Sequence, residues 1–418
     1  MRTRFALHDR LARDGGFPIR TEPFSSWPVF DDESFEAVQK VLASGNVNYW
    51  TGQECREFER EFAEFVGTEN AIAVSNGTVA VELALIAAGV RSGDEVVVSP
   101  RTFVATGSAV VMLKATPVFA DIDPASGNVT AETIAAVLTP KTTAIVVVHA
   151  FGWPADMPAI MALAEEHNLK VIEDCAQAHG AAIDGRRVGS FGHLGAFSFC
   201  QDKIMTTGGE GGMVTTRCPE LWEKAWSFKD HGKSWDACYN DQHDTVFKWL
   251  HETIGTNWRM TEMQGALGRV AVRRLPEWIA QRRANAERLC DLLEEVDGLE
   301  VVRPEPRFEN ACYKFNVNLS LDLLSGDWTR DDIVRAIQAE GIPCGSGLCS
   351  EIYRERALWP FAPPQRLPVA RDFGERSVMF LIHPTLGEED MQDIAAAVAK
   401  VLHHVREGRR QTEAQAAA

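Results

Sequence analysis

The chain has 418 residues, enough for about two or three domains around a large core. Its 45% hydrophobic and 24% charged residues are ordinary for a soluble globular protein. The formal net charge of −17 argues against nucleic acid or anionic lipid as the main partner, although helix N-termini can still bind a small anion.

The nine cysteines are an odd number and are scattered without a CxxC pair. This pattern favours reduced thiols over a disulfide framework or a zinc site, so we expect no metal centre. The N-terminus has no apolar segment of the secretory type, and no apolar run approaches about 18 residues. We therefore expect a cytoplasmic protein without a membrane partner.

Residues 1–30 contain several glycines and prolines, and we interpret them as an N-terminal arm. Acidic residues at 31–33 then begin a helix that runs to about Ser44. Their negative charges stabilise the positive N-terminal end of the helix dipole. A polar and aromatic loop at 48–52 precedes a second helix, Gln53–Phe65. In that loop Tyr49 and Trp50 are either core residues or the wall of a substrate site.

From residue 70 onward, short apolar runs alternate with helical segments. The runs predict strands, which are separated by helices and covered on both faces. The chain therefore predicts an α/β protein with a mostly parallel sheet. The strands are expected at 71–75, 95–99, 117–120, 144–148 and 170–173, and the helices at 78–88, 104–113, 131–138 and 157–167.

The segment 195–216 contains a strand, a single lysine (Lys203), a glycine cluster and a second strand. Burial between strands disfavours an ammonium ion and lowers its pKa, which favours the neutral amine needed for Schiff-base formation. The glycines allow close approach of backbone or ligand. A surface hairpin lysine is the alternative, and this segment alone does not decide between them.

After residue 216 we expect a helix at 221–228, a flexible polar loop at 230–244 and a long helix that ends near Val296. Strand-like stretches at 312–319 and 341–343 flank a helix at 329–339, and a helix at 391–405 closes the fold. We predict a large domain at 31–285, a smaller α+β domain at 286–407 and a disordered tail at 408–418.

Several residues lie where ligands of α/β proteins gather, at the carboxyl ends of strands. The loop 75–78 precedes an apolar helix, so it is either a phosphate site or a simple N-cap. Asp174 ends one strand and is either a partner for a protonated ring nitrogen or an N-cap. His179 is either a ligand contact or a buried core residue, and Phe103 either packs on a ring or fills the core.

These features occur together in one order along the chain. They are the loop 75–78, Asp174 with Gln177, Ser198 five residues before Lys203, the glycines at 208–212 and the run 257–262 (Asn-Trp-Arg-Met-Thr-Glu). From about residue 25 to residue 405 the chain resembles the fold-type-I pyridoxal-phosphate (PLP) aminotransferases of the DegT/DnrJ/EryC1/StrS family. The resemblance implies a mixed, mostly parallel seven-stranded sheet.

The resemblance also implies roles for single residues. Lys203 resembles the lysine that forms the Schiff base with PLP, and Asp174 the partner of the pyridinium nitrogen. The asparagine matching Asn257 belongs to the neighbouring subunit's site in this family, which implies a homodimer with shared sites. The other implied cofactor contacts are Phe103 on the ring face, Gln177 near the ring hydroxyl, and Gly77, Thr78 and Ser198 around the phosphate.

The implied reaction moves an amino group from glutamate or glutamine to a keto sugar, which we expect to be nucleotide-linked. A keto-cyclitol is the alternative acceptor, because residues 15–20 and 27–28 also resemble branches acting on keto-cyclitols or making aminated aromatic precursors. Lys314 contacts a substrate anion or is a solvated edge-strand lysine. Lys203 counts against the family's dehydratase branch, and a non-catalytic binding protein on this fold is the remaining alternative.

Overall fold

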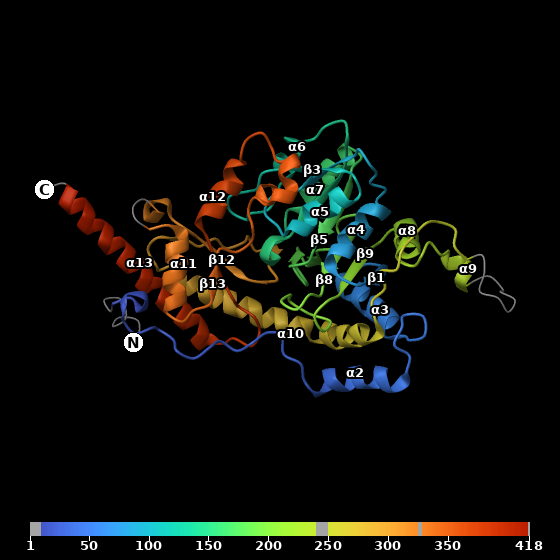
Figure 1. Ribbon diagram of the computed structural model, residues 1–418, viewed down its shortest axis with the longest axis horizontal. Coiled ribbons are helices and arrows are strands. Elements are labelled where there is room, and N and C mark those ends of the chain that lie inside the picture. The colour runs from blue at the N-terminus through green and yellow to red at the C-terminus, as the bar shows by residue number, and fades with distance from the viewer. Residues whose placement is uncertain (1–9, 240–249, 325–327, 417–418) are drawn as a thin grey trace.

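The computed structural model describes residues 10–239, 250–324 and 328–416. Two sheets lie side by side along the long axis of the molecule, and helix α10 (Glu262–Leu293) runs beneath both of them (Figure 1). In the described ranges no helix is both long and apolar enough to cross a membrane. The predicted flexible loop at 230–244 lies partly outside the described residues.

The larger sheet has seven strands in the order β1-β9-β8-β5-β4-β2-β3. All neighbouring pairs from β8 to β3 are parallel, whereas β9 runs antiparallel to both β1 and β8. The predicted mostly parallel α/β sheet is therefore confirmed. The strands are β1 Asn70–Val74, β2 Glu95–Val98, β3 Thr116–Phe119, β4 Thr142–Val148, β5 Lys170–Asp174, β8 Leu194–Ser198 and β9 Gly212–Thr216.

Helices cover both faces of this sheet, which explains the continuous apolar strands. Along β4, Val146 packs with helices on one face, while Ile145 and Val147 pack on the other. The first layer contains α4 Gly77–Ala87, α5 Val104–Met112 and α8 Pro219–Lys229. The other layer contains α3 Glu54–Val66, α6 Ala131–Ala135, α7 Met157–Glu166 and the first half of α10.

The smaller sheet has the order β10-β12-β14-β13 and is antiparallel throughout. Its core is separate and includes α11 Arg330–Ala339, α13 Glu388–Ala416 and the second half of α10. The division into domains at residue 285 stays a prediction, since α10 continues through it. The strands are β10 Leu299–Glu300, β12 Phe315–Leu319, β13 Cys344–Gly345 and β14 Ser377–Phe380; α12 Pro368–Arg376 packs beside them.

Short elements complete the fold. A three-stranded sheet joins β6 Ala182–Ile183, β7 Arg186–Arg187 and β11 Phe308–Glu309. The remaining elements are α2 Asp32–Ser44 and α9 Trp235–Tyr239, with the 3-10 turns η1 Ala12–Asp14, η2 Ala150–Gly152, η3 Leu321–Leu324, η4 Ile352–Arg354 and η5 Arg356–Phe361.

The N-terminal arm is fixed to the body of the protein. The Arg20 guanidinium pairs with Asp390 and Asp393 of α13, and the Trp27 ring packs edge-on against Trp278 of α10 at 5.1 Å between centroids. The Trp27 indole N–H donates to the backbone oxygen of Lys203 at 2.9 Å. The arm therefore reaches the loop that carries the predicted reactive lysine.

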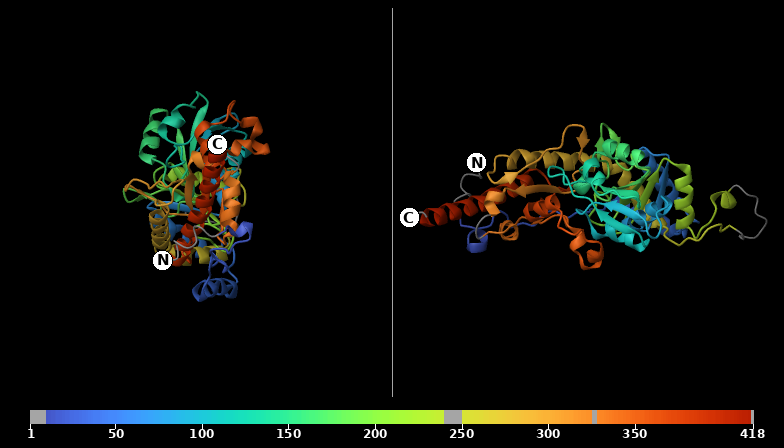
Figure 2. Two further views of the ribbon diagram at one scale, coloured as in Figure 1. Left: turned by 90° about the vertical axis from the view of Figure 1, so that its left-hand side faces the viewer. Right: turned by 90° about the horizontal axis from the view of Figure 1, so that it is seen from above.

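Several predicted boundaries were wrong. Helix α6 ends at Ala135, three residues before the predicted end, and the strand expected at 341–343 lies at Cys344–Gly345. Helix α13 continues to Ala416, where a disordered tail was predicted from Gly408 (Figure 2). Its last turns consist largely of alanine, glutamine, glutamate and arginine, all strong helix formers, so helix propensity extends the element beyond its packed part.

Candidate active site

A cavity of about 680 Å³ opens where the carboxyl ends of the parallel strands meet. The ends of β5 and β8 lie side by side there, and α4 begins after β1 at the same edge. Eight of the residues proposed from the sequence line this cavity. They are Gly77, Thr78, Phe103, Asp174, Gln177, Ser198, Lys203 and Lys314.

Lys203 lies in the turn between β8 and β9 and is half-buried. Its backbone N–H donates to the Cys200 oxygen at 3.1 Å, and its own oxygen accepts from Trp27. Its Nζ atom lies 5.0 Å from the centre of the Tyr313 ring. The main chain is thus held on both sides while the amine extends into the cavity.

Asp174 ends β5 on the cavity wall and is 7% exposed. Its Oδ2 accepts from the Thr106 hydroxyl at 2.9 Å, and its Oδ1 accepts from the Ala176 N–H at 3.2 Å. Burial raises the pKa of Asp174. A protonated ring nitrogen beside this carboxylate would offset the loss of hydration on burial and favour the charged form of Asp174.

The neighbouring carboxylate, Glu173, lies on the opposite face of the strand because side chains alternate along β5. Its Oε1 accepts from the N–H groups of Phe191 and Gly192 at 2.8 and 2.7 Å, and its Oε2 from Gly189 at 2.9 Å. His149 Nε2 lies 3.1 Å from Oε2 as a fourth partner. Glu173 therefore fixes the loop before β8, whereas Asp174 faces the cavity.

The N-terminus of α4 forms one wall. Asn76 is its N-cap and accepts from the Val79 N–H at 2.9 Å, which leaves the first N–H groups of Gly77 and Thr78 directed out of the helix. A Cβ atom at Gly77 would lie 2.4 Å from the Ser198 Cβ, so only glycine allows β8 and α4 to approach this closely. Helix dipole, N–H donors and the Ser198 hydroxyl together make a site for a phosphate.

Gln177 and Phe103 line the same cavity as Asp174. The Gln177 Oε1 accepts from the Phe151 N–H at 2.9 Å, so its NH₂ group remains a donor. Phe103 precedes α5, is 65% exposed and lines the cavity. An exposed aromatic face at a cavity rim suits stacking on a planar ligand.

A third group borders the lysine. The Tyr313 hydroxyl donates to Asp202 Oδ2 at 2.5 Å, and Lys314 Nζ lies 3.3 Å from the same oxygen. Although partial burial opposes it, the hydrogen bond from Tyr313 and the charges of Lys203 and Lys314 lower the pKa of Asp202. Sequence reasoning missed Asp202 and Thr106; the position of Asp202 beside Lys203 was the available signal.

Four proposed residues lie outside the cavity lining. Tyr49 is buried and donates to Glu59 at 3.2 Å, while Trp50 donates to Asp230 at 2.9 Å. His179 is fully buried, with ring centres 5.5 and 5.7 Å from Phe197 and Phe199. Burial and the charge of Lys203 lower the pKa of His179 to about 3, so it is a neutral core residue. The fourth residue, Asn257, forms an isolated antiparallel β-bridge with Asp230 through the backbone.

Comparison with known proteins adds to this geometry. The model of the DegT/DnrJ/EryC1/StrS aminotransferase family matches residues 28–399. The chain belongs to this family. Aminotransferases of the family depend on PLP, and the chain is therefore a PLP-dependent aminotransferase of the fold-type-I class. The family resemblance inferred from the sequence is confirmed.

Among curated relatives, this aminotransferase is 36% identical over 379 residues to UDP-N-acetyl-3-dehydro-alpha-D-glucosamine 3-aminotransferase of Acidithiobacillus ferrooxidans, covering 89% of this chain and 94% of that one. It is 37% identical over 424 residues to L-glutamine:2-deoxy-scyllo-inosose aminotransferase of Streptomyces kanamyceticus, covering 94% and 97%. The relatives thus include both kinds of acceptor that the sequence left open.

Solved structures give the same fold. The aminotransferase from Psychrobacter cryohalolentis is 54% identical, with a TM-score of 0.90 over 92% of this chain and 100% of that chain. A 3-amino-5-hydroxybenzoic acid synthase is 30% identical, with a TM-score of 0.82 over 91% and 99%.

The cavity fits the cofactor of the family on its own geometry. The N-terminus of α4, where a side chain at Gly77 would collide with Ser198, suits the phosphate. The buried Asp174 suits the ring nitrogen, the exposed Phe103 ring suits the planar face, and the Lys203 amine lines the same space. Phosphate, ring and carbonyl thus each have a matching group in one cavity.

Proposed function

We propose that this cavity holds PLP and that Lys203, Asp174 and the α4 N-terminus carry out amino transfer. The observation that carries the proposal is that a lysine amine and a buried carboxylate line one cavity whose wall is a helix N-terminus. When bound, PLP supplies an electron sink for the substrate's reacting carbon. No other described lysine lines the cavity except Lys314, which contacts Asp202.

The roles follow from the positions of the side chains. Lys203 Nζ would take the proton from the donor carbon that bears the amino group and pass it to the carbonyl carbon of the cofactor, and in the second half-reaction it would move a proton in the reverse direction, onto the acceptor carbon. Asp174 holds a proton on the ring nitrogen through its negative charge. Gln177 donates its NH₂ group toward the ring edge, and Gly77, Thr78 and Ser198 hold the phosphate. Phe103 excludes water from one face of the ring.

We infer that L-glutamine or L-glutamate is the donor and that the acceptor is a keto sugar linked to a nucleotide. The relative from A. ferrooxidans is named for a UDP-linked acceptor, which supports this class. A keto-cyclitol is the second candidate because the relative from S. kanamyceticus is named for 2-deoxy-scyllo-inosose and covers 94% of this chain.

Lys314 offers a test that separates the two acceptors. Its ammonium group lines the cavity and would contact a nucleotide phosphate, whereas a cyclitol carries no charge. Amination by L-glutamine is measured with a UDP-linked 3-keto sugar and with 2-deoxy-scyllo-inosose. We expect the UDP-linked acceptor to react with the higher kcat/KM. Lys314→Met should raise the KM for this acceptor by roughly tenfold, because one hydrogen bond to a charged group is lost. A higher kcat/KM for the cyclitol, insensitive to Lys314→Met, would establish the second candidate.

We infer a cytoplasmic homodimer with shared sites. Asp230 is fully buried and accepts from Trp50, Lys233 and Arg259, so it fixes the segment that carries Asn257. Asn257 would reach the phosphate in the neighbouring subunit. Mixing the Asn257→Ala and Lys203→Ala proteins creates one complete site in each heterodimer, so activity at limiting PLP should rise to about half the wild-type rate. Activity at the mean of the two parents, with subunit exchange confirmed, would contradict the shared site.

A further inference from the structure

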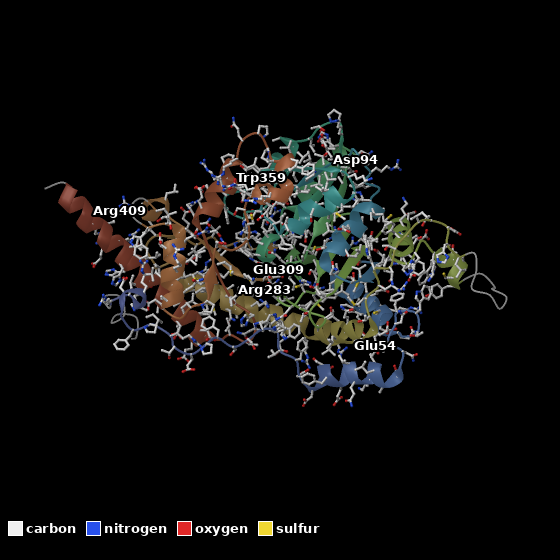
Figure 3. All side chains as sticks on the ribbon, in the orientation of Figure 1. Glu54, Asp94, Arg283, Glu309, Trp359 and Arg409 are labelled. Carbon is white, nitrogen blue, oxygen red and sulfur yellow. The ribbon has the colours of Figure 1, made fainter. Side chains whose placement is uncertain are left out.

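A second cavity, of about 490 Å³, lies between the larger sheet and the smaller one. Its lining comes from the turn after β4, from α10, from β11 and from β12, and it includes neither Lys203 nor Asp174. Arg283 and Glu309, which form an ion pair at 3.1 Å, lie at this junction (Figure 3). The Phe151 ring borders both cavities. The family's amino-transfer chemistry does not account for this second space.

The cavity is bordered by a buried arginine, Arg101, that has no counterion in the part of the chain that the structure describes. Arg101 is 2% exposed, and its guanidinium carbon lies 4.9 Å from the centre of the Phe151 ring and 4.4 Å from that of Phe373. Nη1 makes one long hydrogen bond, 3.4 Å, to the Gly127 oxygen, and Nε has no partner among the described residues. Within the same ranges no acidic group lies in ion-pair distance of Arg101.

This arrangement is costly for the protein alone. Burial lowers the pKa of Arg101 to about 9, so the group is still charged at neutral pH. A charge taken out of water without a partner destabilises the fold, and the two aromatic rings compensate only in part. Two acidic side chains of the lining are engaged elsewhere, since Glu309 pairs with Arg283 and Glu300 with Arg376, and the third, Glu287, is exposed to solvent.

A second polar group in the lining is also unsatisfied. Asn318 on β12 is 4% exposed, and its Oδ1 has no hydrogen-bond partner among the residues that the structure describes. The remaining wall combines charged and amide side chains with a larger apolar part, which includes Phe151, Trp153, Phe308, Phe315, Phe373 and Ile382. A buried cation, a buried acceptor and apolar walls together resemble a small-molecule pocket rather than a solvent channel.

We propose that this cavity is a second ligand site, which binds a small carboxylate with an apolar body. The guanidinium plane matches a carboxylate through two parallel N–H···O bonds, and a hydroxyl of the ligand would donate to Asn318 Oδ1. A carboxylate fits better than a phosphate because Arg101 is the one buried cation without an ion pair among the described residues of the lining, and most of the wall is apolar. This site is independent of the proposed amino-transfer function.

The test uses 4-bromobenzoate on the holoenzyme, with the neutral 4-bromobenzamide as its control. Calorimetry should show that the acid binds the wild-type protein roughly 10- to 100-fold more tightly than the amide does. This ratio is expected because the acid gains a hydrogen bond between charged groups that the amide lacks. Anomalous scattering from bromine should place the acid beside Arg101. Equal binding of acid and amide, or bromine in the active-site cavity alone, would overturn the proposal.

Variants sharpen the test. Arg101→Met should remove the preference for the acid, and Arg101→Lys, which keeps the charge but loses the planar fork, should weaken binding about tenfold. Arg283→Met is the matched control, since Arg283 lines the same cavity but is paired with Glu309, and it should change the affinity less than about threefold. Unchanged binding in Arg101→Lys, or tighter binding of inorganic phosphate than of 4-bromobenzoate, would contradict the assignment of the ligand class.

Discussion

The two halves of the active-site cavity are built in different ways. The half proposed to hold the cofactor consists of strand ends and a helix N-terminus, with Asp174 and Ser198 buried at 7% exposure each. The half near Lys314 consists of side chains from two loops, where Asp202 and Tyr313 meet from positions 111 residues apart. The sheet fixes the first half, whereas loop backbone hydrogen bonds and side-chain contacts hold the second. We therefore expect mutations to abolish chemistry in the first half and to tune substrate affinity in the second.

The largest effect should follow removal of the Lys203 amine. In Lys203→Ala the phosphate and ring contacts remain, so PLP should still bind, but no group moves the proton at the substrate carbon. General acid–base catalysis alone contributes about 10²–10⁴-fold, so turnover should fall at least that far. Single-turnover assays with L-glutamine check this. A turnover within tenfold of wild type would show that another residue carries the proton.

Asp174→Asn and Glu173→Gln are a matched pair, because each replaces a carboxylate by its amide on adjacent positions of β5. Asp174→Asn cannot stabilise a positive ring nitrogen, so kcat should fall on the order of 10²–10³-fold with the fold retained. Glu173→Gln places an NH₂ group among N–H donors and should lower the free energy of unfolding by roughly 1.5–3 kcal/mol without a comparable loss of kcat.

Kinetics and thermal unfolding of the two variants give the readout. The reverse pattern, a catalytic loss in Glu173→Gln and a near-normal rate in Asp174→Asn, would mean that the wrong carboxylate has been assigned to the ring.

In the substrate half, Tyr313→Phe should have a smaller effect. It removes the hydrogen bond that helps lower the pKa of Asp202, so that pKa should rise in the variant. Asp202 would then be protonated at a higher pH, and the acidic limb of the kcat/KM profile should move toward neutral. At neutral pH we expect a change of at most about tenfold, in KM rather than kcat. An unchanged pH profile would separate Asp202 from substrate binding.

The smallest expected effect on catalysis concerns His179, which lies outside the cavity lining and should affect stability instead. The folded-state pKa of His179 is about 3, below the ordinary unfolded value of 6.5, so the unfolded chain binds the extra proton between these values. The contribution of His179 to stability is present above pH 6.5 and is lost as the pH falls toward 3, by up to about 1.4 kcal/mol per pH unit. His179→Leu should flatten this dependence in unfolding measured between pH 7 and pH 4.5; an equal slope would show that His179 is protonated in the folded state.

The same contrast explains what the sequence could predict. The apolar strands and the motifs around Asp174 and Lys203 are local, so the parallel sheet and the cofactor half follow from short segments. For Tyr49, Trp50 and His179 the choice between core residue and substrate contact stayed open, because a sequence does not tell a buried aromatic residue from an exposed one. Asp202 was missed because its role depends on Tyr313, which is brought near only by the fold. The burial of the Arg101 charge is likewise evident only from the fold, which brings the rings of Phe151 and Phe373 against its guanidinium group.

The most direct test of the account is the identity of the lysine that holds the cofactor. Borohydride reduction of the holoenzyme followed by peptide mapping should find a phosphopyridoxyl group on Lys203 alone. Lys314, the other lysine in the cavity lining, is the internal control and should remain unmodified. A phosphopyridoxyl group on Lys314 or on any residue other than Lys203, or the absence of one, would contradict the proposed site.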